Sequence, residues 1–480
     1  MFTTTFSQLA RVTGGKLNAP AHCSAVSIES VSSDTRTLQQ GDLFVALSGA
    51  KYDGHNFLEE AIARGAIGVV VSAGLNSTLA DGNNVPQVVV GDTLLALQKL
   101  AQWNAAQSDS LKIGITGSVG KTTTRHMIQT VLSQEFHGIQ SPGNFNNQIG
   151  VALSLLQLKE EHEFGVIEFG ASSPGEIAEL ARWTEPEIGV LTNLGPAHLD
   201  GFGSVETVIQ SKAELIDAVG ENGLMILPIE TACIPEIKRR LPSRVITTGQ
   251  LKECDVFAEN LSFQQGVLQF SVEQNAYRLQ VPGKHFLNAA LISLGIAREL
   301  GLSCQQIQAG FNQFKPLAGR CQLRRMGNWT IIDDCYNANP LSALAGLNAI
   351  AELAGVKNRI AVLGDMLGLG ERAAHYHRKL GTQIAKSNLD FLLVYGQFAN
   401  DVAHGALLAG MNGSRIGVFS DLGLLKEILA LWLDDECGIL VKGSRHMQME
   451  RVLTWLEKQA ESQLQASSKV EPIRPYRQAG

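Results

Sequence analysis

The chain has 480 residues, of which 45% are hydrophobic and 18% charged, and its formal net charge is −7 at pH 7. It is too long for one hydrophobic core, so roughly three domains are expected, and the acidic balance argues against nucleic acid as a bulk partner. The seven cysteines are widely spaced without a C-x-x-C pair, the N-terminus has no signal-peptide pattern, and no apolar run is long enough to span a bilayer. We therefore expect a protein of the reducing cytoplasm, without membrane insertion.

Residues 1–107 are expected to form a first domain of alternating short strands and helices, ending in an amphipathic helix at 93–107. Its most distinctive residues are Ser33, Asp34 and Arg36, which offer a hydroxyl, a carboxylate and a guanidinium within four residues. Such a group suits a sugar nucleotide, because the planar fork of arginine can bond two oxygens of a diphosphate together. A solvated turn is the alternative, since short clusters of this kind are common.

Residues 108–314 show repeated strand and helix patterns, which predict a parallel sheet covered by helices. The repeat opens with a strand, a glycine turn and a helix, and the turn contains Gly117, Ser118, Val119, Gly120, Lys121, Thr122 and Thr123. Backbone N–H groups and the helix N-terminus would converge there on a phosphate. Lys121 would reach the β- and γ-phosphates of a nucleotide, and the Thr122 hydroxyl would contact Mg²⁺. The usual glycine six residues before the lysine is Ile115 here, so the loop is a shortened variant. An ordinary glycine turn with an exposed lysine is the alternative.

Polar residues also follow later strands of this domain. Glu168 lies near the end of a strand at 164–169, and His198 follows another strand. Because ligands bind beyond the carboxyl ends of parallel strands, both side chains are expected to converge on the phosphate loop, where they could hold a second divalent cation. An edge carboxylate and a capping histidine are the plainer alternatives. An asparagine-rich turn that includes Asn144 and Asn147 is expected to open a helix.

Lys212 falls on the apolar stripe of a helix predicted at 204–219. A lysine on a buried helix face is unusual unless it is paired, and a snorkelling or salt-bridged side chain is the alternative to a functional one. Burial would lower its pKa and leave a neutral amine. Such an amine could take up CO₂ as a carbamate and become a carboxylate-like metal ligand.

Residues 315–466 repeat the strand, loop and helix pattern, which suggests a second, doubly wound sheet with Rossmann-like topology. One of its strands runs into a polar turn at 333–340. Before this domain, Asn288 lies at the start of a predicted helix. Its side chain has donor and acceptor groups suited to an adenine edge, and an ordinary helix start is the alternative. Residues 467–480 are expected to be a disordered tail.

Three motifs together resemble the Mur ligases, the ATP-dependent amino-acid and peptide ligases of bacterial peptidoglycan synthesis. The motifs are the loop at 116–123, the stretch at 193–200 and Lys212. The resemblance runs from about residue 30 to about residue 455. It implies a three-domain α/β fold, with a small UDP-binding domain, a central phosphate-loop domain built on a parallel sheet, and a Rossmann-like third domain.

Within this family, the motifs at 334–340, 364–366 and 442–445 are similar to those of the members that join D-alanyl-D-alanine to UDP-N-acetylmuramoyl-tripeptide. One departure is Cys335, which stands where a serine is usual. These two molecules, together with ATP, are the substrates that the resemblance implies, and a monomer is the expected state. Whether the third residue of the tripeptide is diaminopimelate or lysine stays open.

The resemblance also implies roles for single residues. The implied ATP contacts are Gly117, Ser118, Val119, Gly120, Lys121, Thr122, Thr123, Asn288, Arg320 and Asp334. The implied ligands at two Mg²⁺ sites are Thr122, Glu168, His198 and Lys212, with Lys212 carbamylated as in relatives. The implied substrate contacts are Ser33, Asp34, Arg36, Asn144, Asn147, Tyr336 and Asn337. Catalytic roles are implied for Lys121, His198 and Lys212.

The implied reaction begins with attack of the tripeptide carboxylate on the γ-phosphate of ATP, which gives an acyl phosphate that the amine of D-alanyl-D-alanine then opens. Two anions meet in the first step, so clustered positive charge is the main requirement. Another Mur-type ligase, one that adds an amino acid, is an alternative within the family, and three further alternatives lie outside it. Folylpolyglutamate synthase shares the fold but lacks a domain for a UDP-sugar, a phosphate-loop ATPase needs no third sheet, and a binding module explains neither Lys212 nor the metal ligands.

Overall fold

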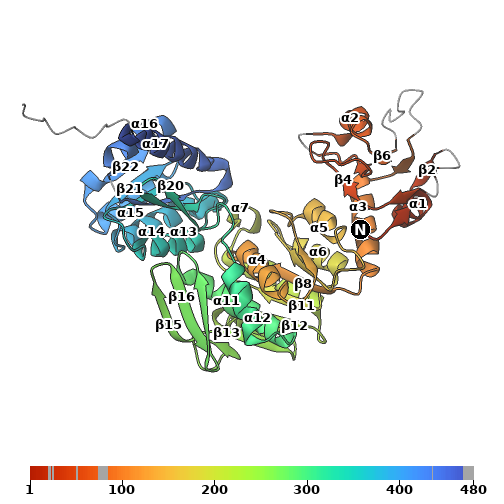
Figure 1. Ribbon diagram of the computed structural model, residues 1–480, viewed down its shortest axis with the longest axis horizontal. Helices are drawn as coiled ribbons and strands as arrows, with labels where there is room; N and C mark the ends of the chain where they lie inside the picture. Colours follow the sequence, from red (N-terminus) through yellow and green to blue (C-terminus); the bar gives the residue numbers. More distant parts are fainter. Residues whose placement is uncertain (20–22, 24–25, 50–51, 74–84, 435, 469–480) are drawn as a thin grey trace, which may run out of the picture. The chain divides into compact units, whose positions relative to one another are not determined.

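The computed structural model describes residues 1–19, 23, 26–49, 52–73, 85–434 and 436–468. The chain divides into two compact units, each with strands and helices of its own. Figure 1 shows these strands and helices coloured along the sequence. The first unit holds residues 1–193, 209–256 and 291–310, and the second holds 194–208, 257–290 and the chain from 311 onward. The predicted α/β class is confirmed, whereas the predicted domain boundaries stay a prediction.

The N-terminal part of the first unit is built on a five-stranded sheet in the order β2–β7–β6–β5–β4. Its pairings are parallel except for that of β2 with β7. The strands are β2 (Lys16–Asn18), β4 (Val31–Ser32), β5 (Leu43–Val45), β6 (Gly68–Ser72) and β7 (Gln87–Val90). A separate antiparallel pair joins β1 (Thr4–Thr5) to β3 (Ser27–Ile28).

The helices of this part are α1 (Phe6–Thr13), η2 (Gly54–Phe57), α2 (Leu58–Ala63) and α3 (Thr93–Ala106). Helix α3 confirms the helix predicted at 93–107. It begins where the Asp92 side chain accepts a hydrogen bond from the Leu95 N–H group, a typical N-cap. Its fully buried Asn104 donates to the carbonyls of Leu155 and Leu158 at 2.9 and 3.0 Å, which attaches α3 to the segment 155–158.

A seven-stranded sheet forms the centre of the first unit, in the order β14–β13–β12–β11–β8–β10–β9. The strands are β8 (Leu111–Thr116), β9 (Gly138–Gln140), β10 (Phe164–Glu168), β11 (Ile188–Leu191), β12 (Leu224–Pro228), β13 (Val245–Gly249) and β14 (Val256–Phe257). The pairings from β13 to β9 are all parallel, which confirms the predicted parallel sheet. Ile113 and Ile115 of β8 are fully buried, as expected for a central strand covered on both faces.

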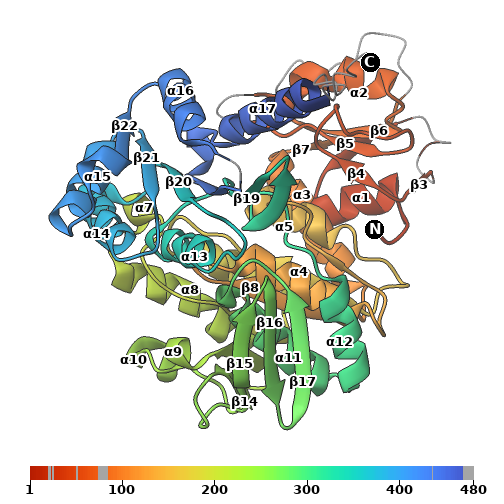
Figure 2. The same cartoon turned by 60° about the vertical axis from the view of Figure 1, so that its left-hand side comes forward.

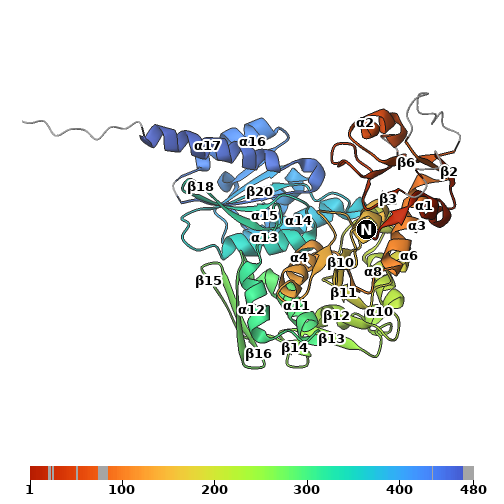
Figure 3. The ribbon, with the colours of Figure 1, turned by 45° about the vertical axis from the view of Figure 1, so that its right-hand side comes forward.

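The helices that follow these strands are α4 (Lys121–Leu132), α5 (Gln148–Leu155), α6 (Glu176–Thr184), α7 (Leu199–Phe202), α8 (Val205–Val219), α9 (Ile229–Ala232), α10 (Pro235–Lys238), α11 (Leu287–Glu299) and α12 (Cys304–Gln313). Figure 3 shows α4 and α11 on one side of the central sheet and α6 and α8 on the other. Because the strands run in one direction, the carboxyl ends of β8, β10 and β11 open on the same edge, where ligands bind in sheets of this kind.

The second unit contains two sheets. A three-stranded antiparallel sheet consists of β15 (Glu259–Gln264), β16 (Val267–Val272) and β17 (Asn275–Gln280). A six-stranded sheet has the order β18–β19–β23–β20–β21–β22, with every pairing parallel except that of β18 with β19. Its strands are β18 (Gln322–Met326), β19 (Trp329–Asp334), β20 (Arg359–Gly364), β21 (Phe391–Tyr395), β22 (Ile416–Phe419) and β23 (Gly438–Lys442).

Helices cover both faces of the six-stranded sheet, and Figure 2 shows α13, α14 and α15 on one face with α16 and α17 on the other. They are α13 (Pro340–Ala351), α14 (Ala373–Ala385), α15 (Ala399–Leu408), α16 (Leu422–Trp432) and α17 (Glu450–Ser468). Short 3₁₀ turns occur at η3 (Lys284–Phe286), η4 (Gly370–Arg372), η5 (Gly413–Arg415) and η6 (Arg445–Met447). The layout matches the predicted doubly wound sheet. Helix α17 runs to Ser468, and the rest of the predicted tail, residues 469–480, lies outside the described residues.

Within the part of the chain that the structure describes, we find no helix with both the length and the apolar character needed to cross a membrane.

Candidate active site

The loop between β8 and α4 has the backbone shape of a phosphate site. Gly117 has a φ of +149° and Gly120 a φ of +92°, conformations that L side chains rarely adopt. A Cβ atom on Gly117 would lie 1.9 Å from Thr192 Oγ1, so no larger residue fits there without movement of Thr192. The Thr192 hydroxyl donates to the Val119 carbonyl at 2.7 Å and holds the loop against the end of β11.

Lys121 and Thr122 begin helix α4 and face the same loop. Lys121 Nζ donates to the Gly117 carbonyl at 2.8 Å, which places the ammonium over the loop. The buried Thr122 hydroxyl donates to Glu168 Oε1 at 3.3 Å. The N-terminus of α4 adds a partial positive charge. A glycine loop with a cation and a hydroxyl in these positions can hold the phosphates of a nucleotide and their Mg²⁺.

Glu168 ends strand β10 and is 1% exposed. Its Oε1 accepts from Asn146 Nδ2 at 2.9 Å as well as from Thr122, and its Oε2 accepts from Arg125 Nη1 at 3.1 Å. The backbone N–H of Glu168 donates to Ser141 Oγ at 3.1 Å. The structure therefore brings Glu168 to the phosphate loop and orients both of its oxygens.

Sequence reasoning missed Arg125 and Asn146. Arg125 lies on the buried stripe of α4, three residues before Ile128, and is 2% exposed. The signal that could have found it is the one that singled out Lys212, a cation on the apolar face of a helix. Asn146 belongs to the asparagine-rich turn that was predicted, but nothing in that turn distinguishes the asparagine that faces inward.

The other asparagines of that turn have different surroundings. Asn147 is the N-cap of α5, and its Oδ1 accepts from the Gly150 N–H group at 2.9 Å. Asn144 is exposed. Their contacts with a substrate stay a prediction.

Lys212 lies on α8 and is 3% exposed, so its predicted burial is confirmed. Burial, together with the nearby charge of Lys121, lowers its pKa from 10.5 to about 7. Glu176 and Glu214 oppose this shift. The amine donates to the Ala171 carbonyl at 3.4 Å. A substantial share of the amine is therefore neutral near pH 7, which is the state that can react with CO₂.

No three His, Cys, Asp or Glu side chains of the described residues gather around a common metal position. A hydroxyl and a single carboxylate can fit Mg²⁺, which usually takes one or two carboxylates and completes its shell with phosphate oxygens and water. Thr122 and Glu168 offer such oxygens beside the phosphate loop.

The predicted nucleotide-sugar residues of the first domain lie together after β4. Arg36 Nη2 is 2.6 Å from Asp34 Oδ2, and the Arg36 side chain is 84% exposed. This guanidinium holds the pKa of Asp34 below its usual value. Ser33 is half-buried beside them. Arginine and carboxylate are thus paired with each other at the surface, and their part in binding stays a prediction.

His198 and Asn288 belong to the second unit. His198 is exposed and has a φ of +51°, which is uncommon for a residue with a side chain and often marks a functional position. Its carbonyl accepts from the N–H groups of Gly201 and Phe202, which form the turn of α7. Asn288 lies in the first turn of α11 and is half-buried. Their approach to the nucleotide stays a prediction.

The ends of β19 and β23 carry a second polar group in this unit. Asp334 and Lys442 form a buried ion pair, with 2.6 Å between Asp334 Oδ2 and Lys442 Nζ. Lys442 Nζ also donates to the Asn337 carbonyl at 2.9 Å. The Arg320 guanidinium lies 3.8 Å from the centre of the Tyr336 ring, a cation–π contact. The structure thus brings together the residues predicted here for ATP and substrate.

Cys335 stands beside this group, in surroundings that disfavour the reactive thiolate. Its thiol donates to Asp333 Oδ1 at 2.9 Å, and burial raises its pKa well above the usual value for cysteine. A thiol with a raised pKa is unreactive. The replacement of the usual serine is therefore compatible with chemistry that requires no cysteine.

A buried histidine holds the loop after β20. His377 Nε2 accepts from the Met366 N–H group at 3.0 Å, and its Nδ1 shares a 2.7 Å hydrogen bond with the Ala373 carbonyl. Only Nδ1–H can donate to a carbonyl while Nε2 accepts, so the ring is neutral. Burial lowers the pKa of His377 and favours the same state.

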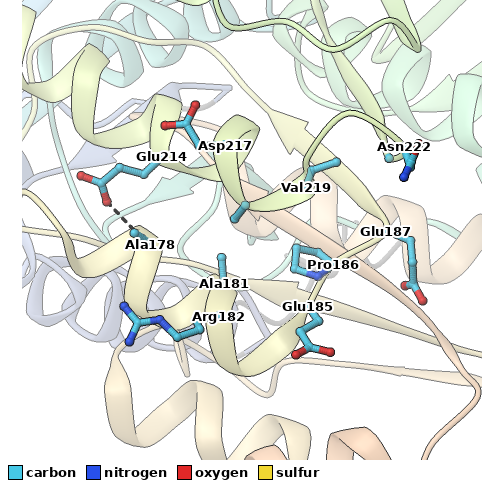
Figure 4. Close-up of a pocket in the computed structure, with 12 residues that line it drawn as sticks. Ala178, Ala181, Arg182, Glu185, Pro186, Glu187, Glu214, Asp217, Val219 and Asn222 are labelled. Atoms are coloured by element: carbon cyan, nitrogen blue, oxygen red, sulfur yellow. Dashed lines mark hydrogen bonds between the residues drawn. The ribbon is translucent and has the colours of Figure 1, made fainter.

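A groove of about 660 Å³ lies between α6 and α8 in the first unit. Figure 4 shows the Glu214 carboxylate on its wall, accepting from the Ala178 N–H group at 3.0 Å. Glu187, also on the wall, precedes β11 at the end of that strand away from the phosphate loop, and accepts from the Lys112 N–H group at 2.7 Å. Among the described residues, the lining includes none of the predicted site residues, so the groove is separate from the candidate active site.

The fold and the phosphate loop define an α/β protein that binds a nucleotide. The sequence matches three family models, which are "Mur ligase family, catalytic domain" over residues 27–104, "Mur ligase middle domain" over 115–297, and "Mur ligase, glutamate ligase domain" over 319–445. The UDP-N-acetylmuramoyl-tripeptide–D-alanyl-D-alanine ligase of Escherichia coli K12 is 32% identical over 467 residues, which cover 95% of this chain and 99% of that protein. The chain belongs to the Mur ligase family.

Solved structures agree with this assignment. A crystal structure of MurF from Acinetobacter baumannii has a TM-score of 0.83 and 29% identity, and the match covers 95% of this chain and 99% of that one. The MurF ligase of Thermotoga maritima, solved in complex with ADP, has a TM-score of 0.77 and 26% identity, with coverage of 91% and 98%.

Proposed function

We propose that this chain is a ligase that uses ATP to join D-alanyl-D-alanine to UDP-N-acetylmuramoyl-tripeptide, releasing ADP and phosphate. The observation that carries the proposal is similarity over nearly the whole chain, 95% of it, to the E. coli ligase of that name. The phosphate loop with Lys121 and Thr122 supports it. We further propose that the enzyme acts in the cytoplasm as a monomer and makes the last soluble precursor of peptidoglycan.

The phosphate loop is assigned to ATP. Gly117 and Gly120 leave room for the backbone of 117–123 to approach the phosphates, and Lys121 offsets their charge. Asn288, Arg320 and Asp334 are assigned to the adenine, phosphate and ribose. The ADP complex named for the Thermotoga maritima ligase is in keeping with this assignment.

Two Mg²⁺ ions are assigned to the predicted metal ligands. Thr122 and Glu168 would hold one, and Glu168, His198 and a carbamylated Lys212 would hold the other. When bound, these ions neutralise phosphate charge as the two anionic reactants meet. The neutral amine that burial favours at Lys212 supports carbamylation.

UDP-N-acetylmuramoyl-tripeptide and D-alanyl-D-alanine are assigned to the remaining predicted residues. Ser33, Asp34 and Arg36 would hold the UDP group, for which Arg36 must exchange its Asp34 partner for phosphate oxygens. The substrate contacts assigned to the peptide groups are Asn144, Asn147, Tyr336 and Asn337. The tripeptide carboxylate attacks the γ-phosphate, and the D-alanyl-D-alanine amine then displaces phosphate from the acyl phosphate.

The deciding experiment measures phosphate release from ATP with each substrate alone and with both. We expect release to require UDP-N-acetylmuramoyl-tripeptide and D-alanyl-D-alanine together, with a matching mass gain in the UDP-peptide. Release from ATP that neither substrate changes would favour an ATPase instead. Release that follows a folate and glutamate would favour a folylpolyglutamate synthase.

A further inference from the structure

Arg125 is a buried cation in the wall of the phosphate site. It lies one turn after Lys121 on α4 and its side chain is 2% exposed. Burying an arginine costs free energy unless its N–H donors are paired. The groups that pair with Arg125 therefore indicate which parts of the site it positions.

The guanidinium bonds to three separate segments. Arg125 Nε donates to Gln140 Oε1 at 3.0 Å, on β9. Arg125 Nη1 donates to the Gly143 carbonyl at 3.0 Å, in the asparagine-rich turn, and to Glu168 Oε2 at 3.1 Å, at the end of β10. One side chain therefore fastens the first helix of the nucleotide site to the turn and to the strand beside it.

These bonds determine how Glu168 presents its carboxylate. Arg125 engages Oε2, while Oε1 lies 3.3 Å from the Thr122 hydroxyl and 2.9 Å from Asn146 Nδ2. Because Arg125 engages one oxygen of the carboxylate, the other oxygen is left facing the Thr122 hydroxyl. Mutation of groups that orient a metal ligand in this way typically lowers metal affinity about 10- to 100-fold.

We propose that Arg125 is a positioning residue for Mg²⁺, which holds Glu168 so that its Oε1 faces the Thr122 hydroxyl. The inference rests on the proposed function, since it assigns Mg²⁺ to Thr122 and Glu168. It goes beyond the assigned ligands, because Arg125 contacts Glu168 and would act through that carboxylate.

The test compares Arg125→Met, Arg125→Lys and wild type. ADP binding is measured by calorimetry over a series of Mg²⁺ concentrations, and ligase activity is titrated with Mg²⁺ in parallel. Arg182→Met is the matched control, because it is the same substitution at an exposed arginine of the first unit. Thermal unfolding of each variant shows whether it is folded.

For folded Arg125→Met, we expect the Mg²⁺ concentration at half-saturation to rise about 10- to 100-fold in both measurements. Arg125→Lys keeps the charge and one hydrogen bond, and should recover part of the loss. In a Glu168→Gln background, Arg125→Met should add little, because the residue acts through that carboxylate. Arg182→Met should match wild type.

An unchanged or lowered half-saturating Mg²⁺ concentration in folded Arg125→Met would overturn the inference, and so would additive effects with Glu168→Gln. If Arg125→Met does not fold, the Arg125→Lys titration decides alone, and a wild-type Mg²⁺ curve there refutes the role. Failure of the proposed function is distinguishable, because wild-type enzyme would then bind ADP with Mg²⁺ but form no UDP-peptide product.

Discussion

Carbamylation of Lys212 can be tested directly by replacing the lysine. The structure places its pKa at about 7 instead of 10.5. At pH 7.5 roughly three quarters of such amines are neutral, against roughly 0.1% of unshifted ones. Since only the neutral amine reacts with CO₂, the burial of Lys212 favours the form of the side chain that can be carbamylated.

The assay follows both the modification and the activity. Wild-type enzyme incubated with ¹³C-bicarbonate should show a carbamate carbon by NMR, and Lys212→Ala should lack it. Ligase activity of Lys212→Ala should fall about 10- to 100-fold, as for loss of a metal-site group, and added acetate should restore part of it. Lys238→Ala, at an exposed lysine of the same unit, should keep both signals.

The lowered pKa of Lys212 also predicts the direction in which the free energy of unfolding changes with pH, which stability measurements can check. Because the folded-state pKa of the unmodified amine is lowered, the unfolded chain binds more protons between pH 7 and 10.5, so the free energy of unfolding rises with pH across that window. The full difference is at most about 5 kcal/mol, and Lys212→Met should remove the slope. Full activity in Lys212→Ala, or an active wild type without a carbamate signal, would refute the reasoning.

Three further predictions concern backbone and titration. Gly117→Ala should weaken ADP binding at least about 10-fold, as measured by calorimetry. The positive φ costs a residue with a side chain about 1–3 kcal/mol, and the new Cβ would meet Thr192 Oγ1. Wild-type affinity in this variant would contradict the prediction. Gly381→Ala should lower the unfolding free energy of the second unit by about 1–3 kcal/mol in urea titrations, since its Cβ would lie 2.0 Å from the Val402 carbonyl oxygen. The free energy of unfolding should fall as the pH drops below about 6.5, because the unfolded chain takes up a proton that buried His377 resists. In His377→Leu, the loss of unfolding free energy at low pH should be smaller. A variant with the same pH profile as wild type would count against this role of His377.

Much of the fold was predictable because its signals are local. Glycine spacing and the switch from strand to helix around Lys121 predict the phosphate loop, and the apolar stripe around Lys212 predicts burial, which the structure confirms. Strand and helix repeats predict parallel sheets for the same reason, since periodicity is a property of neighbouring residues. None of these needs knowledge of which strands lie side by side.

The partners of the site residues were not predictable in this way. Asp34 and Arg36 are two positions apart, yet the sequence does not reveal that they pair with each other. Asp334 and Lys442 are 108 positions apart and meet because β19 and β23 are neighbours in the sheet.

By itself, the sequence determined the α/β class, the phosphate loop and the place of Lys212 on the apolar stripe of a helix, because these follow from residue type and from the spacing of neighbouring residues. Only the tertiary structure decided that Arg125 holds Glu168. Those residues lie 43 positions apart, on a helix and on a strand of the central sheet. The order of strands brings β10 beside β8, and that order is set by packing of the whole sheet, which no local pattern encodes.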